Sequence, residues 1–384
     1  MRSVYVAGVG STAFGKHLDR SLRDLGREAV SAALADAGID HRDLQAGYCG
    51  NALGPVLHGE TGVGQNVFWE VGVSGIPIVN VENACASGST ALHLAWQAVA
   101  AEIYDVVAVV GVDKAVMPKG TPLKVGDADM EVKLGDIFPG TFAMVAQKHM
   151  EAYGTTPEQM AMVSVKNHAN GCLNPFAEFK KPLTVEEVLG SPKIADPITL
   201  FSCCPNSDGA SAVILCSDAV RKKLAAPAIR IAASVLRTGD YENQHRDLTR
   251  WEVEEKASAA AYEQAGLGPE DMSLIEVHDA FTICEIVHYE GLGLCPRGEG
   301  GRLIEDKVTE IGGAKPVNPS GGLLAKGHPI GASGVGQIVE TALQLRGQAG
   351  SRQIEGARVG LTHMMGGSKE GDARACNIHI VVAD

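Results

Sequence analysis

No stretch of this sequence is apolar for long enough to cross a membrane, since none approaches the ~20 residues that a spanning helix needs. Pairs of the form Cys-x-x-Cys are also absent, and the nine cysteines stand at irregular spacings. This spacing indicates reduced thiols rather than a disulfide framework or a zinc site. Positive charge is in deficit, because 33 Lys and Arg face 46 Asp and Glu, a formal net charge of -13. That balance argues against nucleic acid or an anionic membrane as the main partner.

The ends of the chain carry neither a cleavable leader pattern nor a peroxisomal address, so we expect a cytoplasmic protein. The composition is that of a globular protein, with 45% hydrophobic and 21% charged residues. Its 384 residues are enough for one large domain or two ordinary ones with a substantial core.

A weak internal repeat organises the chain. A strand and an alanine-rich helix that stops at Gly38 are matched, in the second half, by a strand and a helix that stops at Gly266. Further along, Cys85-Ala-Ser-Gly-Ser89 and Gly331-Ala-Ser-Gly-Val335 each open a helix that leads into a valine-rich strand. Alanine-rich helices also look alike by chance, but the shared order of four elements argues against chance. The alternation of strands and helices predicts an α/β fold with a mixed sheet and helices on both faces.

Between the repeats, the segment Lys114–Pro205 breaks the pattern. It is rich in Gly, Pro, Met and Lys and contains one clear helix near Thr156–Asn170. Such a segment is typical of an insertion that covers a substrate.

Cys85 lies where an apolar, strand-like stretch gives way to a helix. A cysteine in the first turn of a helix is near the positive end of the helix dipole and near unpaired backbone N–H groups. Both stabilise a thiolate, which is the nucleophilic form of cysteine. The sequence therefore predicts an enzyme that works through a thioester on Cys85.

Three histidines stand in motifs at strand ends or in glycine-rich turns, where α/β folds place their ligands. They are His278 in Glu276-Val-His-Asp-Ala-Phe-Thr282, His328 in Asn318-Pro-Ser-Gly-Gly-Leu-Leu-Ala-Lys-Gly-His-Pro329, and His363 in Leu361-Thr-His-Met-Met-Gly-Gly367. A thiol that attacks an acyl carbonyl needs a base for its proton and donors for the oxyanion. We assign the base to His328 and an oxyanion donor to His278, although a histidine beside Gly and Pro is often only a turn residue. The other histidines and cysteines stand in no motif and are expected in the core or at the surface.

Together these motifs resemble those of thiolases, and within them the sterol-carrier-protein type, which includes lipid-transfer-protein and acetyl-CoA acetyltransferase-like enzymes. The resemblance covers the whole chain, and the glycine-rich motif around His328 is its most specific part. It implies two similar halves, residues 1–220 and 221–384, each a five-stranded sheet with helices, stacked as α-β-α-β-α layers. It also implies a loop domain inserted at about 114–205, an obligate homodimer, and coenzyme A as co-substrate with no permanently bound cofactor or metal.

The resemblance maps the nucleophile onto Cys85 and the thiol-activating histidine onto His328. It implies a second oxyanion hole from backbone N–H groups of Cys85, Met365 and Gly366. Substrate contacts are expected from Phe281 and from a run of loop residues, namely Ser320, Gly321 and Gly322.

The sequence departs from the family pattern at the second catalytic cysteine, which moves the proton at the substrate carbon. One of its two usual positions matches His363 and the other matches Ala280. The resemblance therefore leaves His363, His278 or a water molecule for this step.

The resemblance implies thiolytic cleavage of a 3-oxoacyl-CoA, with a bulky, branched or aromatic acyl group such as that of benzoylsuccinyl-CoA. The alternatives are the reverse condensation that forms acetoacetyl-CoA, and a thiolase-fold aldolase acting on CoA thioesters. Such aldolases tend to lose the cysteine and the Gly-His-Pro histidine, both of which this chain keeps. A ketoacyl synthase and a non-catalytic CoA-binding subunit fit the motifs less well. One subgroup of bacterial and archaeal thiolases acts with a small zinc-ribbon/OB-fold protein, and we expect such a partner here.

Overall fold

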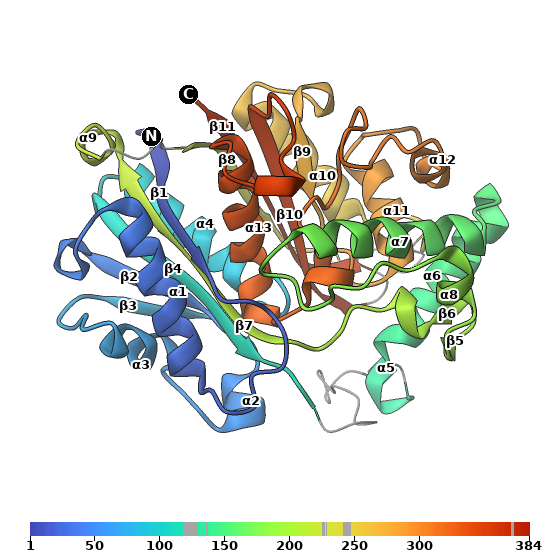
Figure 1. The fold of residues 1–384 in the computed structure, drawn as a ribbon, viewed down its shortest axis with the longest axis horizontal. Coiled ribbons are helices and arrows are strands. Elements are labelled where there is room, and N and C mark those ends of the chain that lie inside the picture. Colours follow the sequence, from blue (N-terminus) through green and yellow to red (C-terminus); the bar gives the residue numbers. More distant parts are fainter. Residues whose placement is uncertain (118–129, 136, 225–226, 228, 241–246, 370–371) are drawn as a thin grey trace.

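The structure is a computed structural model that describes residues 1–384 except 118–129, 136, 225–226, 228, 241–246 and 370–371. Its main feature is a mixed sheet whose strands come from both halves of the chain (Figure 1). In spatial order the strands are β3 (Ile78–Val81), β2 (Ala46–Gly50), β4 (Val106–Lys114), β7 (Asp208–Ser217), β1 (Val4–Ser11), β8 (Ile229–Arg237), β11 (Asp372–Ala383), β10 (Val359–Lys369) and β9 (Leu274–Glu276).

The two halves of this sheet repeat one another. Strand β1 pairs antiparallel with β7, which pairs antiparallel with β4, and β8, β11 and β10 follow the same order. Next to them, β2 and β9 run parallel to β4 and β10. The predicted repeat is therefore present in the strand order.

The two predicted five-stranded halves are joined in one sheet, and in the described residues the second half contributes four strands to it. The halves join at one edge, where Tyr5 and Val6 of β1 pair with Arg230 and Ile229 of β8. In the second half the place of β3 is taken by Val317, which forms a single bridge to Ile275. Proline at 316 and again at 319 explains why no longer strand forms there, since proline has no N–H to donate.

Helices cover the sheet as the expected α-β-α-β-α layers. Helix α1 packs on β1, β7 and β4, and α10 packs on β8 and β11, which makes the two outer layers. Helices α4 and α13 pack on one another and on strands of both halves, so they form the central layer (Figure 1). The bounds are α1 (Leu22–Ala37), α2 (Gly54–His58), α3 (Val63–Glu70), α4 (Ser87–Ala100), α5 (Met130–Lys133), α6 (Phe138–Tyr153), α7 (Pro157–Leu173), α8 (Val185–Leu189), α9 (Asp218–Arg221), α10 (Glu252–Ala265), α11 (Thr282–Gly291), α12 (Gly300–Glu305) and α13 (Ile330–Leu345).

The matched helices end as their glycines predict. Gly38 and Gly266 have φ of 69° and 67°, and the N–H of each donates back to carbonyls of the last turn. Left-handed backbone of this kind is open to glycine at little energetic cost, which explains why both helices stop there.

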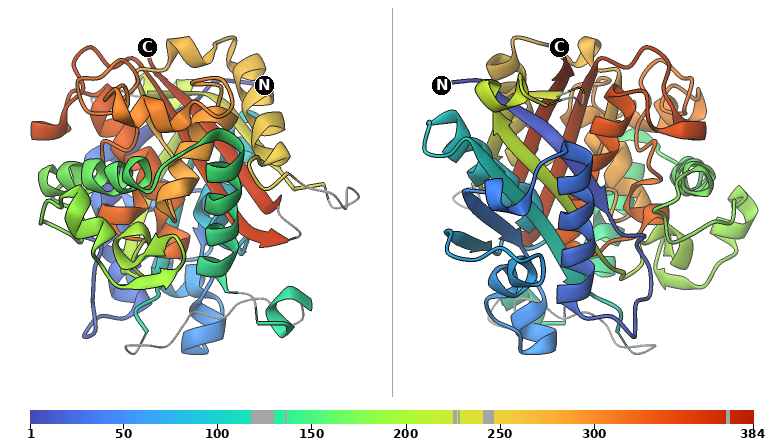
Figure 2. Two further views of the ribbon diagram at one scale, coloured as in Figure 1. Left: turned by 90° about the vertical axis from the view of Figure 1, so that its right-hand side faces the viewer. Right: turned by 60° about the vertical axis from the view of Figure 1, so that its left-hand side comes forward.

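Two outer helices in the segment between β4 and β7 cover the second half rather than the first. Helix α7 packs on α11 and α12, and α6 packs on α11 (Figure 2, left). The buried ammonium of Lys166 in α7 lies 2.5 Å from the carboxylate of Glu285 in α11, which fixes the two helices together. Within the parts of the chain that the structure describes, no helix has the length and apolar character that crossing a bilayer requires.

Candidate active site

Cys85 lies in a tight turn between β3 and α4. The helix begins at Ser87 with Ala86 as its N-cap, so Cys85 precedes the helix instead of occupying its first turn as predicted. Ala84 has a φ of 48°, an uncommon conformation for a residue with a Cβ. The turn is closed by the Ser87 hydroxyl, which accepts from the Asn83 N–H at 2.9 Å and donates to the Ala84 carbonyl at 2.6 Å.

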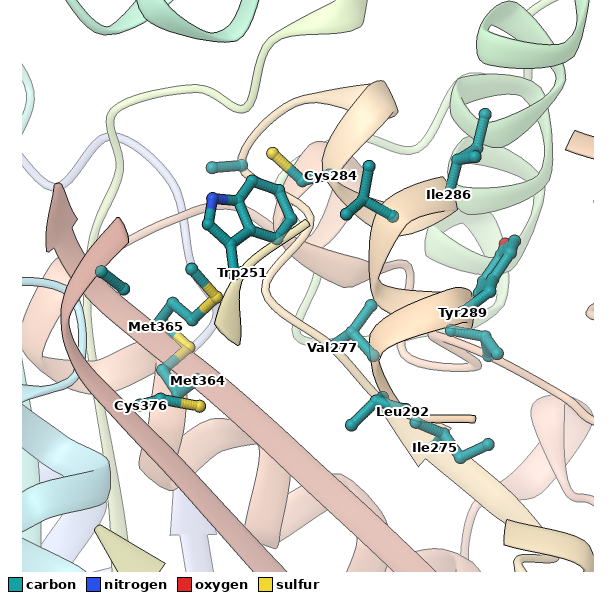
Figure 3. Packing of buried hydrophobic residues seen from close by; sticks show 14 of the residues in the cluster. Trp251, Ile275, Val277, Cys284, Ile286, Tyr289, Leu292, Met364, Met365 and Cys376 are labelled. Carbon is teal, nitrogen blue, oxygen red and sulfur yellow. The ribbon is translucent and has the colours of Figure 1, made fainter. Parts of the chain in front are cut away.

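The glycines after Met365 touch this turn. A Cβ on Gly366 would lie 2.3 Å from the Asn83 carbonyl oxygen, so only glycine permits this approach. The next N–H along the chain, that of Gly367, donates to the Cys85 sulfur. Met365 itself packs beside Trp251 in the buried cluster of Figure 3. Met365 and Gly366 thus adjoin the Cys85 turn, and their role as oxyanion donors stays a prediction.

The Cys85 thiol is not held as a thiolate in this environment. Burial raises its pKa to about 12, and the nearby carboxylates of Asp113 and Glu82 add to the rise. The hydrogen bond from Gly367 opposes the shift without reversing it. The predicted dipole-stabilised thiolate is therefore wrong for the resting site, and Cys85 needs a base to become a nucleophile.

His328 has the protonation state that such a base requires. Its Nδ1 lies 2.8 Å from the Ser333 hydroxyl, which donates its own hydrogen to the Pro329 carbonyl at 2.9 Å. Since that hydroxyl hydrogen is already used, Nδ1 must carry the proton and Nε2 is left with a free lone pair. Burial lowers the pKa of His328 to about 4, so the ring is neutral at physiological pH.

Cys85, His278 and His328 come together. One side-chain atom from each, the Cys85 sulfur and a nitrogen of each ring, lies within 4.8 Å of the other two. The His278 and His328 rings meet edge to face, with centroids 5.6 Å apart and planes at 70°. In the described part of the chain, Nε2 of each ring is buried without a hydrogen-bond partner. These two nitrogens are therefore available to a bound substrate.

Two models of the family domains match this chain. The thiolase N-terminal domain matches residues 4–219, and a thiolase C-terminal domain-like model matches residues 237–375. The chain belongs to the thiolase family.

Its relatives agree with this assignment. The chain is 44% identical to an acetyl-CoA acetyltransferase of Methanothermobacter thermautotrophicus, over 96% of this chain and 97% of that protein. It is 42% identical to the benzoylsuccinyl-CoA thiolase subunit BbsB of Thauera aromatica, over 95% of each chain. It is 40% identical to sterol carrier protein 2 of Gallus gallus, over 95% of this chain and 70% of that protein. The protein is accordingly an acyltransferase of the thiolase type, and the predicted sterol-carrier-type resemblance is confirmed.

Among solved structures, the Ltp2-ChsH2(DUF35) aldolase superposes on the whole chain with a TM-score of 0.83 at 27% identity, covering 98% of that protein's chain. The likeness extends through both halves of the thiolase and its outer helices.

His363 lies outside the group around Cys85. Its ring is fully buried and packs on His288, with centroids 4.4 Å apart, and its Nε2 is 3.5 Å from a Glu254 oxygen. Burial and the neighbouring histidines hold the pKa of His363 well below its usual range. This position does not favour direct proton transfer to a substrate carbon, and the role of His363 in that step stays a prediction.

Glu254 and His288 support the His278 loop from behind. His288 donates from Nε2 to the His278 carbonyl at 3.1 Å, while its Nδ1 lies 2.8 Å from Glu254. Glu254 and His288 lie on different helices, 34 positions apart in the chain. No sequence motif marks them as a pair, and sequence reasoning therefore missed both.

The predicted substrate contacts separate into two kinds. Phe281 stacks on Phe142 of α6, with centroids 4.6 Å apart, so a helix from the segment between β4 and β7 reaches the site. Ser320, Gly321 and Gly322 lie in the interior, and the Ser320 hydroxyl donates to Glu276 at 2.6 Å. In this structure these three residues build the loop that leads to His328.

Asp279 joins that loop to the His278 motif. Its carboxylate accepts from the Leu323 N–H at 2.6 Å and from the Asn167 amide at 2.7 Å. A Cβ on Gly322 would lie 2.2 Å from the same carboxylate. The two histidine motifs are therefore held in register by one aspartate.

The donor set of Cys85 and its two histidines is also one that Zn²⁺ accepts. A metal there would occupy the sulfur needed for attack, so we expect added Zn²⁺ to inhibit the thiolase. The absence of a metal from the reaction stays a prediction.

Proposed function

We propose that this thiolase cleaves a 3-oxoacyl-CoA by thiolysis, through an acyl group carried on Cys85. The observation that supports this most is the meeting of a cysteine sulfur with two neutral imidazoles within 4.8 Å, whose Nε2 atoms have no hydrogen-bond partner among the described residues. Coenzyme A enters as co-substrate, and no permanently bound cofactor is required by the chemistry.

In the first half-reaction His328 Nε2 takes the proton of the Cys85 thiol as the sulfur attacks the 3-oxo carbonyl. The protonated His328 and the Nε2–H form of His278 then donate to the oxyanion. When the carbonyl re-forms, the bond between carbons 2 and 3 breaks and the acyl group stays on Cys85.

In the second half-reaction the sulfur of CoA attacks the thioester on Cys85. We propose that backbone N–H groups of Cys85 and of the Met365–Gly366 turn, extended to Gly367, hold the second oxyanion. Support comes from the Gly367 N–H, which donates to the Cys85 sulfur.

Mass spectrometry of the intact protein after mixing with a 3-oxoacyl-CoA tests this proposal. The wild type should gain the acyl mass at Cys85, and Cys85→Ala should gain none. A wild type that turns over substrate with no adduct at Cys85, under rapid quench, would show the proposal to be wrong.

The acyl group and the direction of the reaction are further proposals. We favour degradation of a bulky, branched or aromatic substrate, supported by 42% identity to a benzoylsuccinyl-CoA thiolase subunit. Acetoacetyl-CoA formation is the second candidate, supported by 44% identity to an acetyl-CoA acetyltransferase. Comparison of kcat/KM for acetoacetyl-CoA and for an aromatic 3-oxoacyl-CoA decides between them.

A thiolase-fold aldolase is the third candidate, because the superposed solved structure is described as an aldolase. Release of an aldehyde or ketone together with an acyl-CoA, without CoA consumption, would identify that reaction.

We also infer a small zinc-ribbon/OB-fold partner. Support comes from the description of one relative as a subunit and of the superposed structure as a complex with a DUF35 chain. Exposed apolar side chains at Met130, Leu134 and Met144 provide a surface for it on the segment between β4 and β7. Co-expression with the neighbouring gene product and size-exclusion chromatography should give one shared peak, and separate peaks would contradict the inference.

A homodimer and a cytoplasmic location complete the proposal. The open edge strand β3 with exposed Val79, and the exposed Trp69 of α3, give an apolar surface for a second copy. Light scattering should give twice the 40.1 kDa chain mass. Cell fractionation tests the location.

A further inference from the structure

The chemistry of the proposed cleavage leaves one group unassigned. Breaking the bond between carbons 2 and 3 leaves an electron pair on carbon 2, and that carbon needs a proton. His328 has received the Cys85 proton and serves the oxyanion together with His278. A separate proton donor must therefore face the site.

The segment that precedes β7 runs between the two histidine motifs. Cys203 forms a bridge with Phe281, and the Cys204 N–H donates to the Ala280 carbonyl at 2.9 Å. Two residues later Asn206 forms a bridge with His328, and the Ser207 hydroxyl accepts from the His328 N–H at 3.0 Å. Cys204 is thus tied on one side to the His278 loop and followed at once by contacts to the His328 loop.

The Cys204 thiol shares the environment of Cys85. Burial, and after it the charges of Cys203, Asp279 and Cys85, raise the pKa of Cys204 well above its usual range. Both cysteines are partly exposed, whereas Cys284 and Cys376 are 1% and 0% exposed. Cys204 is therefore a protonated, partly exposed thiol on the segment that joins the two histidine loops.

Its neighbour Cys203 is oriented differently. The Cys203 sulfur donates to the Thr199 carbonyl at 3.3 Å, back along its own segment. The Cys203 sulfur is thus occupied within its own segment, which leaves Cys204 as the candidate of this pair.

We propose that Cys204 is the group that carries the proton to and from carbon 2 of the substrate. This assignment rests on the proposed thiolysis and deepens it. As the bond between carbons 2 and 3 breaks, its electron pair takes the Cys204 proton, which leaves an acyl-CoA and a Cys204 thiolate. The thiolate then takes the proton of the incoming CoA thiol while that sulfur forms the new thioester and Cys85 leaves as a thiolate. His328 returns its proton to Cys85, and both cysteines end as thiols.

Exchange of the acetyl protons of acetyl-CoA in D₂O isolates the step at carbon 2, and acylation of Cys85 by acetyl-CoA isolates the step at sulfur. Cys204→Ala should lose exchange and thiolysis by ~10²–10⁴-fold, the range of a general acid–base group, while Cys85 is still acylated. Cys203→Ala is the matched control and should retain both reactions. The same measurement on His363→Ala tests the alternative donor.

Cys204→Ser nearly keeps the side-chain volume and should also lose exchange, because a hydroxyl is a much weaker acid than a thiol. This variant tests the role of Cys204 if Cys204→Ala does not fold. Wild-type exchange in a folded, acylated Cys204 variant would overturn the assignment and leave the acyl-enzyme proposal intact. A wild type that is never acylated at Cys85 would instead overturn the proposed thiolysis.

Discussion

At the scale of single residues, the site holds Cys85 and His328 as a pair of neutral side chains. Burial raises the pKa of the Cys85 thiol to about 12 and lowers that of His328 to about 4, so neither is charged before substrate binds. A neutral thiol resists oxidation and alkylation better than a thiolate does. Attack then depends on proton transfer to His328 at the moment the carbonyl arrives.

This pair predicts an unusual pH profile. The folded state lowers the pKa of His328 from its ordinary 6.5 to about 4. The neutral ring therefore contributes its full stability above pH 6.5, and this stability is lost as the pH falls from 6.5 through about 4. The rate of Cys85 acylation in single turnover should therefore stay level from about pH 8 to about pH 5. An acid limb centred near 6.5 would show that the base has an ordinary histidine pKa, which would contradict the depressed pKa of His328.

Ser333 sets the tautomer of His328, so removal of the Ser333 hydroxyl should slow the acylation of Cys85. A lost buried hydrogen bond of about 1–3 kcal/mol corresponds to acylation that is roughly fivefold to 150-fold slower for Ser333→Ala. The buried Ser258 bonds the carbonyls of Glu255 and Gly291, so Ser258→Ala is a control that should alter stability alone. Equal acylation rates in both variants would remove Ser333 from the mechanism.

At the scale of elements, the crossing of α4 and α13 builds the site. These helices open with the repeated sequences that hold Cys85 and Gly331, and they meet through glycine. A Cβ on Gly88 would lie 2.1 Å from the Gly331 carbonyl oxygen, and one on Gly334 would lie 2.8 Å from the Ser89 Cβ. The repeat thus brings the nucleophile turn of one half against the helix that follows His328 in the other.

Gly88→Ala should force these helices apart. Overpacking of this kind costs about 1–3 kcal/mol, so the urea midpoint should fall, and acylation should slow because α13 carries Ser333. Ser31→Ala on the exposed face of α1 is the control and should leave the midpoint unchanged. An unchanged midpoint for Gly88→Ala would mean that the crossing can relax freely.

At the scale of the whole molecule, Asp113 joins the two halves behind the site. Its buried carboxylate accepts from Leu53 N–H at 3.0 Å and the Asn51 amide at 2.7 Å on one oxygen, and from Ala52 N–H at 3.0 Å and Gly331 N–H at 2.7 Å on the other. Burial still raises its pKa to about 6. A carboxylate with this many donors couples β4 and the loop that follows β2 in the first half to α13 of the second.

Asp113→Asn should destabilise the protein at every pH. The asparagine NH₂ group cannot accept hydrogen bonds from the N–H groups that it faces, and each N–H left without an acceptor costs about 1–3 kcal/mol of folding free energy. The folded state raises the pKa of Asp113 from its ordinary 3.8 to about 6. The protonated form therefore adds stability that is complete below pH 3.8 and is lost as the pH rises through about 6. The variant should lack this slope in the unfolding free energy. Identical slopes in both proteins would exclude Asp113 as its source.

Much of this architecture could be predicted from local sequence. The glycines at 38 and 266 end their helices because the left-handed conformation they adopt follows from the missing Cβ. The motifs around Cys85, His278 and His328 predicted that three distant segments meet, and they do. These features depend on residue type and short spacings, which a sequence displays directly.

What only the tertiary structure decided depends on burial and on partners far apart in the chain. The same helix start that predicted a thiolate lies in an interior that raises the pKa of Cys85, because desolvation outweighs the few donors nearby. Cys204, Asp113 and His288 stand in no motif, and their neighbours in space are tens to hundreds of positions away. Residue types near a helix start therefore determined which groups could react, whereas packing across the two halves decided where their protons reside.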